Sequence, residues 1–141
     1  FSKERELDFT KTSVFIEGDI SENETTLLSL ARTISDDVKL LDSESRKYLH
    51  LAAVFANNFA NHMFTLANEV LSERGVAFDA IRPLIAETAA KVLEMEPKNA
   101  QTGPAIRLDE KVINNHLELI KDDKIKEIYT ILSESINRHS S

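Results

Sequence analysis

Polar side chains recur at helical spacing within residues 48–62, a segment that is otherwise rich in Ala, Leu and Phe. Counted from His50, the amides Asn57, Asn58 and Asn61 follow seven, eight and eleven positions later, so an α-helix places all four on one stripe. The opposite stripe is apolar and contains small residues, a pattern typical of close helix packing. Burying an amide costs free energy unless it is hydrogen-bonded. Two interpretations stay open: the stripe binds a small polar ligand, or these groups cap neighbouring loops and face water.

A second cluster, Gln101-Thr102-Gly103-Pro104 followed by Arg107, lies in residues 96–108, where two prolines and a glycine predict a loop between helices. A Thr-Gly-Pro turn exposes backbone N–H groups, and the Arg107 guanidinium can hold a carboxylate or phosphate through two parallel hydrogen bonds. Interhelical loops commonly contain Gly and Pro, so a purely structural turn is the alternative interpretation.

Several other kinds of chemistry are disfavoured by residue type and spacing. His50, His62, His116 and His139 lack the spacing of metal ligands, and no HExxH or ExxH pair accompanies them, so we expect no metal site. Cysteine is absent, which removes thiolate zinc sites and cysteine nucleophiles. The sequence has neither a G-x-S-x-G nucleophile elbow nor a G-x-G-x-x-G fingerprint, so it is not expected to bind a dinucleotide in the Rossmann manner by itself.

The stripe must be positioned by one long helix, because residues 46–74 contain neither Gly nor Pro. Ser43 is predicted to cap this helix and Gly75 to end it. Three further helices are expected. The first begins at Asp79, the second at Asp109, and the third at Asp122 or Asp123.

The N-terminal part of the chain has a different pattern. Residues 12–18 and 37–42 are short runs of β-branched and apolar residues, which favour two strands. Between them Ser21 and Glu24 have the spacing of a capping box, which predicts a helix that begins at Ser21. The sequence therefore predicts a short β-α-β segment followed by helices.

Composition sets the class of protein. Of the 141 residues, 42% are hydrophobic and 29% are charged, with a formal net charge of −7. This composition is typical of a globular domain, and its acidity disfavours partners such as nucleic acid or an anionic membrane. The absence of cysteine fits a cytoplasmic location. Because the sequence starts at Phe1 with neither an initiator Met nor a signal peptide, we expect it to be a piece of a longer protein.

The segment His50-Leu-Ala-Ala-Val-Phe-Ala-Asn-Asn58, together with Gln101-Thr-Gly-Pro104 and Arg107-x-Asp109, resembles the C-terminal domain of Rossmann-like oxidoreductases that carry the DUF2520 domain. These proteins are similar to pyrroline-5-carboxylate reductase and the β-hydroxyacid dehydrogenases. The resemblance implies a mainly α fold, a helical domain like the C-terminal domain of 6-phosphogluconate dehydrogenase with a short β-containing N-terminal segment. It also implies NAD(P) as the cofactor of the full-length protein, with none bound by this fragment alone.

The same resemblance implies that the chain is divided between two domains. Residues 1–42 would be the end of the Rossmann-type domain or a connecting β-α-β segment, and residues 43–141 the helical domain for substrate binding and dimerisation. The expected partners are a second copy of the chain, in a homodimer, and a small-molecule substrate.

The residues that match the family pattern can be assigned roles one by one. In the related dehydrogenases a catalytic Lys precedes a pair of Asn on the corresponding helix; Asn57 and Asn58 match the pair, whereas Val54 stands at the Lys position. His50, one turn earlier, is the titratable group that could act as acid or base instead. The expected substrate-binding residues are Asn57, Asn58, Asn61, Thr102, Gly103 and Arg107. The alternative, from the missing Lys, is a non-catalytic helical dimerisation or regulatory module.

Overall fold

The computed structural model describes residues 8–140. This part of the chain is mainly helical with two short strands near its N-terminal end, as the sequence predicted. It packs as two compact units, of which the first ends at Ala60 and the second begins at Asn61. The division into 1–42 and 43–141 concerns the domains of a longer protein and stays a prediction.

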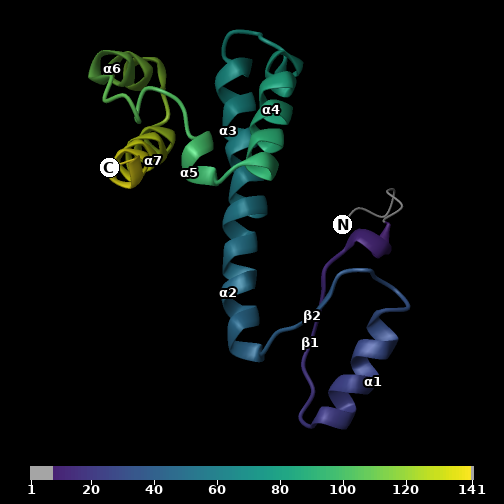
Figure 1. Cartoon of the computed structure of the whole chain (residues 1–141). Coiled ribbons are helices and arrows are strands. Elements are labelled where there is room, and N and C mark those ends of the chain that lie inside the picture. Colours follow the sequence, from purple (N-terminus) through teal and green to yellow (C-terminus); the bar gives the residue numbers. More distant parts are fainter. Residues whose placement is uncertain (1–7, 141) are drawn as a thin grey trace. The chain divides into compact units, whose positions relative to one another are not determined.

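The first unit contains the predicted β-α-β segment (Figure 1). Strand β1 (Val14–Ile16) pairs with β2 (Val38–Leu40) in parallel, and helix α1 (Ser21–Ala31) connects them. A parallel pair cannot be joined by a tight hairpin, so the helix supplies the crossover that this pairing requires. Ile16 and Ala31 are buried and form the apolar core of this small unit.

Ser35 fixes the return from α1 to β2. Its side chain is only 2% exposed, donates a hydrogen bond to the Thr12 carbonyl at 2.6 Å and accepts one from the Asp37 N–H at 3.0 Å. Burying this hydroxyl costs little free energy, because it both donates and accepts a hydrogen bond. These two bonds connect the segment before β1 to the segment before β2.

Two predicted helix caps differ from the structure by one residue. Helix α1 begins at Ser21 as predicted, but its N-cap is Ile20, which makes no side-chain bond; a capping Ser must precede the first helical residue, and Ser21 already lies inside the helix. The long helix is capped by Asp42 rather than Ser43, because the Asp42 carboxylate accepts the Ser45 N–H at 2.8 Å.

Every residue from 43 to 72 is helical, but the helix is not uniform. It consists of α2 (Ser43–Ala53), a π-helical turn η2 (Val54–Phe59) and α3 (Ala60–Ser72). The helix ends as predicted at Gly75, whose φ of +66° is the left-handed conformation that glycine adopts without a steric penalty.

The second unit continues with five further helical segments (Figure 1). These are η3 (Phe78–Ile81), α4 (Arg82–Glu94), the one-turn α5 (Pro97–Ala100), α6 (Glu110–Leu119) and α7 (Asp123–Ser140). Asp109 caps α6, as predicted, by accepting the Val112 N–H at 3.1 Å. Asp122 serves α7 in the same way, accepting the N–H groups of Lys124 and Ile125. Asp79 lies in η3, so α4 starts three residues later than predicted.

Helices α6 and α7 are joined by a polar pair within an apolar groove. His116 Nδ1 and Tyr129 Oη are 2.8 Å apart, and their rings meet edge to face. Side chains of α3, α6 and α7 line the groove beside this pair, with a volume of about 430 Å³. Within residues 8–140, no helix combines the length and apolar character needed to cross a membrane.

Candidate functional site

The π turn carries the paired amides that the sequence singled out. Asn57 and Asn58 both lie in η2, and both are exposed. π turns inside α-helices occur frequently at functional sites, and each of their hydrogen bonds spans five residues instead of four. The prediction that His50, Asn57, Asn58 and Asn61 share one stripe was based on 3.6 residues per turn throughout the helix. The π turn has more residues per turn, so this spacing does not hold between His50 and Asn61.

His50 lies in the last turn of α2, immediately before η2. Its side chain is exposed, and its carbonyl accepts the N–H of Val54, so these two residues are one α-turn apart. Val54, which the sequence comparison matched to the Lys of the related dehydrogenases, is half-buried. The imidazole is thus accessible to a ligand, while the Val54 side chain contributes to packing.

The start of α2 is fixed by a charged cluster in the first unit. Glu17 accepts hydrogen bonds from Ser43 and Arg46, each at 2.5 Å, and Arg46 also donates to the Leu41 carbonyl at 3.0 Å. The bonds from Ser43, with the nearby Arg46 charge, hold the pKa of Glu17 below its usual value. The cluster joins the end of β1 to the first turn of the helix that carries His50.

Three other carboxyl groups of this unit have lowered pKa values for the same kind of reason. A hydrogen bond from Asn23 lowers the pKa of Asp19, one from Ser13 lowers that of Asp37, and the Ser45 N–H lowers that of Asp42. These three groups and Glu17 are therefore more readily ionised in the folded chain.

The turn between α5 and α6 is a folded element in the second unit. Gly103 has a φ of +111°, and the Pro104 carbonyl accepts the N–H of Asp109 at 3.0 Å, which closes the turn onto the α6 cap. Ala105 is 6% exposed and anchors the turn, while Thr102 and Arg107 are exposed. The anchored backbone thus presents a hydroxyl and a guanidinium at the surface.

The predicted site residues fall into both units. His50, Asn57 and Asn58 belong to the first, whereas Asn61, Thr102, Gly103 and Arg107 belong to the second. In the first unit the three residues lie within one helical stretch, and in the second Thr102, Gly103 and Arg107 lie on one turn, whereas Asn61 belongs to α3. The convergence of the two groups on one cleft stays a prediction.

Comparison with known proteins identifies the family. The family model described as a domain of unknown function, DUF2520, matches residues 12–136. The chain belongs to the DUF2520 family. Its structure is similar to the crystal structure of a candidate NADP oxidoreductase from Bacteroides fragilis, with 52% sequence identity and a TM-score of 0.90. The match covers 98% of this chain and 54% of that one, so the chain spans about half the length of this relative. No curated protein matches it.

The β-α-β segment of this DUF2520 domain does not fit a dinucleotide. In Rossmann folds the diphosphate sits at the N-terminus of the helix that follows the first strand. Here that place is occupied by Asp19, Glu22 and Glu24, whose carboxylates repel phosphate. A Cβ on Gly18 would lie 2.6 Å from Glu24 Cγ and 2.7 Å from its backbone N. Gly18 therefore permits close packing of α1 rather than approach of a ligand.

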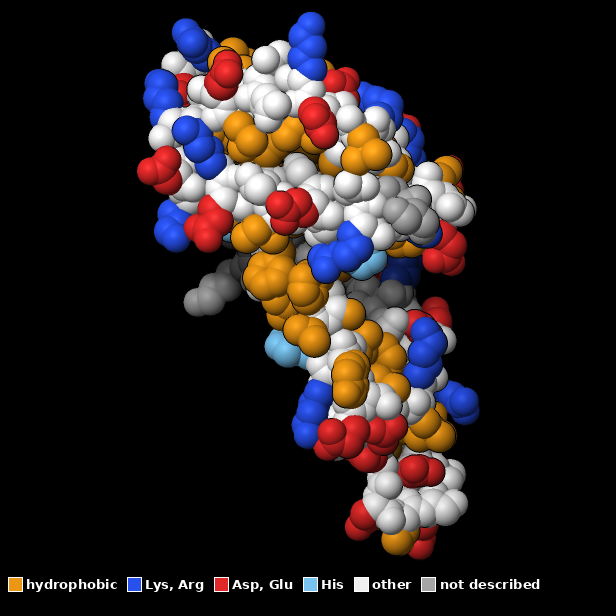
Figure 2. Space-filling view, turned by 90° about the vertical axis from the view of Figure 1, so that its left-hand side faces the viewer, with side chains coloured by type: hydrophobic (Ala, Val, Ile, Leu, Met, Phe, Trp, Pro, Cys, Tyr) orange, Lys and Arg blue, Asp and Glu red, His pale blue; other side chains and the backbone are white. Residues whose placement is uncertain are grey.

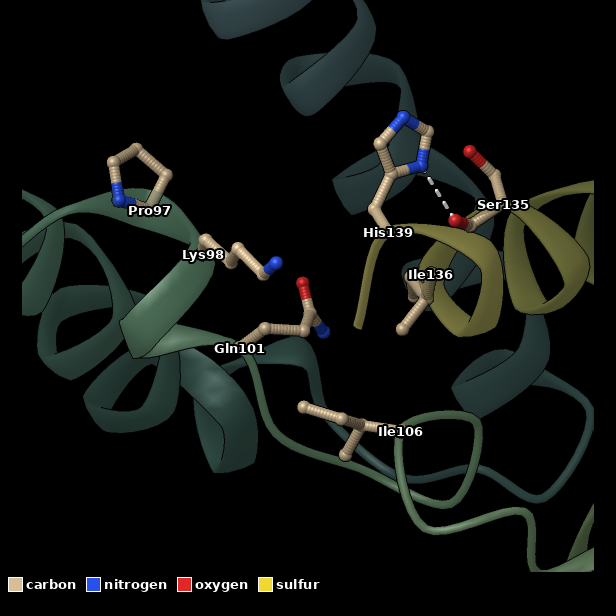
Figure 3. A pocket seen from close by; sticks show the side chains of 7 residues that line it. All are labelled: Pro97, Lys98, Gln101, Ile106, Ser135, Ile136 and His139. Atoms are coloured by element: carbon tan, nitrogen blue, oxygen red, sulfur yellow. Dashed lines mark hydrogen bonds between the residues drawn. The ribbon is translucent and has the colours of Figure 1, made fainter. Parts of the chain in front are cut away.

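A cavity that sequence analysis missed lies beside the 101–109 turn (Figure 3). Its volume is about 440 Å³, and it is lined by side chains from α5, the turn and α7: Pro97, Lys98, Gln101, Ile106, Ser135, Ile136 and His139. Gln101 was the one predicted signal here, since the other lining residues match no motif. Among the described residues, no three His, Asp or Glu side chains are grouped as metal ligands.

Proposed function

We propose that this DUF2520 chain is the substrate-binding and dimerisation domain of an NADP-dependent oxidoreductase. The observation that carries the proposal is its 52% identity, over 98% of its length, to the candidate NADP oxidoreductase. Because the β-α-β segment does not fit the diphosphate of a dinucleotide, the proposal assigns NADP binding to a Rossmann-type domain that is not in this sequence. The absence of cysteine is in keeping with a cytoplasmic enzyme.

In this proposal His50 exchanges a proton with the substrate. The nicotinamide cofactor moves a hydride, which leaves a proton to be given to or taken from the reacting heteroatom. His50 is exposed at the end of α2, next to the exposed amides of Asn57 and Asn58. A neutral imidazole has one ring nitrogen that carries a proton and one that can accept a proton, so it can serve in either direction of the reaction.

The polar residues around His50 are proposed to orient the substrate. Asn57, Asn58 and Asn61 offer amide donors and acceptors, and the exposed Arg107 offers a bidentate contact for an anionic group. Thr102 and the Gly103 N–H would bind the same anionic group, since a turn with an open glycine admits close approach. The proposal requires these two groups of residues to meet in the assembled protein.

The dimerisation part of the proposal is supported by an apolar surface on α2 and η2, which we call the aromatic face. It consists of Tyr48, Leu51, Phe55 and Phe59, all of them exposed. Figure 2 shows hydrophobic side chains gathered along this helix. Phe55 and Phe59 pack edge to face with ring centres 5.1 Å apart. Contiguous exposed apolar surface of this kind marks interaction sites, and a second copy of the chain is the proposed partner.

The catalytic proposal is tested with the full-length protein. We expect it to oxidise NADPH with a compound from a panel of carbonyl and imine substrates. We expect His50→Gln to lower kcat by roughly 10²–10⁴-fold, the usual contribution of general acid–base catalysis. His62→Gln, at another exposed helical histidine, is the matched control and should leave kcat unchanged. Equal kcat in the His50→Gln variant and the wild type would refute the assignment of His50.

A second candidate function is a non-catalytic dimerisation or regulatory module. It is favoured by the half-buried Val54 at the position where the related dehydrogenases have Lys. This alternative predicts an intact dimer with no NADPH oxidation on any member of the panel, and activity on one member would exclude it.

A further inference from the structure

The apolar groove beside His116 and Tyr129 lies wholly within the second unit. Helices α3, α6 and α7 supply most of its lining, together with Ile81 of η3 and Ile120, which follows α6. Its volume of about 430 Å³ falls within the roughly 300–1,000 Å³ of pockets that hold small molecules. The groove is thus large enough to hold one small molecule between helices of a single unit.

The lining of the groove has no charged counterpart to offer a ligand. Among the described residues that line it, all except His116 and Tyr129 are Ala, Val, Leu, Ile or Met, and none is Asp, Glu, Lys or Arg. A charged ligand would lose its hydration here without gaining an opposite charge, which is unfavourable. The lining therefore favours an uncharged ligand.

The body of the ligand is expected to be a hydrocarbon. Val70 of α3, Leu119 of α6 and Leu132 of α7 line the groove and are exposed. A hydrocarbon ring or chain would remove these side chains from water and gain hydrophobic stabilisation. Their exposure also leaves the groove open to a ligand from solvent.

The His116–Tyr129 pair supplies the polar contact of the groove. The 2.8 Å bond between His116 Nδ1 and Tyr129 Oη uses one donor and one acceptor. If Oη donates this bond, it still has a lone pair that can accept; if Nδ1 donates it, the Oη hydrogen is left to donate. Tyr129 Oη can therefore bond one further group in either tautomer of His116. A ligand hydroxyl fits both cases, because it can donate or accept.

Two polar contacts hold the helices around the groove. The His116–Tyr129 bond joins α6 to α7, and an ion pair of 2.8 Å between Lys121 and Glu73 joins the connection between these helices to the end of α3. The walls of the groove are thus connected to one another without a ligand, as is usual for small-molecule sites.

We propose that the apolar groove is a binding site for a small uncharged molecule with a hydrocarbon body and one hydroxyl group. The hydrocarbon body lies against the aliphatic side chains of α3, α6 and α7, and the hydroxyl bonds Tyr129 Oη. The proposal goes beyond the oxidoreductase function and does not depend on it, because the lining belongs to the second unit alone and includes none of the proposed substrate-binding residues.

The test uses full-length protein with ¹³C-labelled isoleucine methyl groups, followed by NMR. The probes share one ring: benzyl alcohol, toluene, which lacks the hydroxyl, and benzoate, which is charged. We expect millimolar binding of benzyl alcohol, with shifts at the methyl groups of Ile125 and Ile128 in the groove and none at Ile16 in the first unit. Benzoate should bind at least about tenfold more weakly, because the lining has no cation for its charge.

Two tyrosine variants test the polar contact. Tyr129→Phe should lower the ratio of benzyl alcohol affinity to toluene affinity about tenfold, because only the alcohol loses a hydrogen-bond partner. A general loosening of the groove would weaken both probes and leave this ratio unchanged. Tyr48→Phe, in the first unit and outside the groove, is the matched control and should not change the ratio.

A third variant tests the apolar wall and does not alter the polar pair. Ala67→Leu adds a larger side chain to the lining from α3 and should weaken benzyl alcohol and toluene alike, each at least about tenfold. Ala89→Leu, at an exposed position of α4 outside the groove, should leave both affinities unchanged. The methyl spectrum of each variant without probe shows whether the second unit is folded, and Ala67→Leu decides if Tyr129→Phe is not.

Four results would overturn the proposal. Benzyl alcohol could leave Ile125 and Ile128 unshifted, or benzoate could bind as tightly as the alcohol. A folded Tyr129→Phe variant could keep the wild-type ratio, or a folded Ala67→Leu variant the wild-type affinities. A further result assigns the groove to a second copy of the chain: the Ile125 and Ile128 signals change on dilution without probe and do not respond to benzyl alcohol.

Discussion

Phe55→Ala is expected to weaken the proposed dimer without unfolding the helix. The Phe55 side chain is 63% exposed in the single chain. Fully burying a phenylalanine contributes about 1.5–3 kcal/mol, so covering the exposed part contributes about 1–2 kcal/mol per protomer. A two-fold interface uses the same residue on both protomers, and the expected loss is therefore about 2–4 kcal/mol, or roughly 30–900-fold in the dimer Kd.

The dimer Kd of full-length wild type and variant can be measured by sedimentation velocity over a dilution series. Circular dichroism should show unchanged helix content, because Ala has a higher helix propensity than Phe. Leu30→Ala is the matched control, since Leu30 is 59% exposed but lies on α1, away from the aromatic face. A wild-type protein that stays monomeric at high micromolar concentration would refute the argument. A Kd equal in Phe55→Ala and wild type would refute the placement of the interface.

Three further predictions concern the substrate amides and the first unit. Asn57→Ala and Asn58→Ala should each raise KM about tenfold through lost hydrogen bonds, and steady-state kinetics with an unchanged KM would contradict this role. Ser35→Ala should cost about 1–2 kcal/mol by removing a buried hydroxyl that bonds a part-buried carbonyl and N–H, whereas the exposed Ser29→Ala should change stability by less than about 0.5 kcal/mol; hydrogen exchange of the β1 and β2 amides measures both. The four carboxyl groups with lowered pKa values should stabilise the first unit fully above their ordinary values of 4.5 for Glu and 3.8 for Asp, and lose this effect as the pH falls through the lowered values. Equal exchange protection at pH 6 and pH 3 would contradict that expectation.

Local signals made much of the fold predictable. Asp109 and Asp122 cap helices, and Gly75 ends one, because each acts through hydrogen bonds or dihedral angles of its own segment. The two strands were predictable from short β-branched and apolar runs on either side of a helix. The caps at Ser21 and Ser43 were misplaced by one residue, because neighbouring polar residues offer equivalent cap chemistry.

The site was predictable only in part, for physical reasons that differ between its components. Helical periodicity predicted His50, Asn57 and Asn58 opposite a packed apolar stripe, but apolar residues of that stripe such as Phe55 and Phe59 are exposed as well, so periodicity alone does not explain the exposure. The π turn depends on whether each N–H selects a carbonyl four or five residues back. No residue type dictates that choice in a run without Gly or Pro. The cavity brings residues of α5, the 101–109 turn and α7 together, so its lining emerges only from tertiary packing.

The π turn also determines how this helix should be aligned with those of relatives. A π turn takes up one residue more than an α turn, so it can absorb a single-residue insertion without interrupting the helix. A relative without that residue would continue as a regular α-helix, in which each residue advances the side-chain direction by about 100°. Aligned without a gap, this chain and such a relative would correspond either before Val54 or after Phe59, but not on both sides of the π turn. A gap placed within η2 is consequently the alignment that keeps both His50 and Asn61 opposite their structural equivalents.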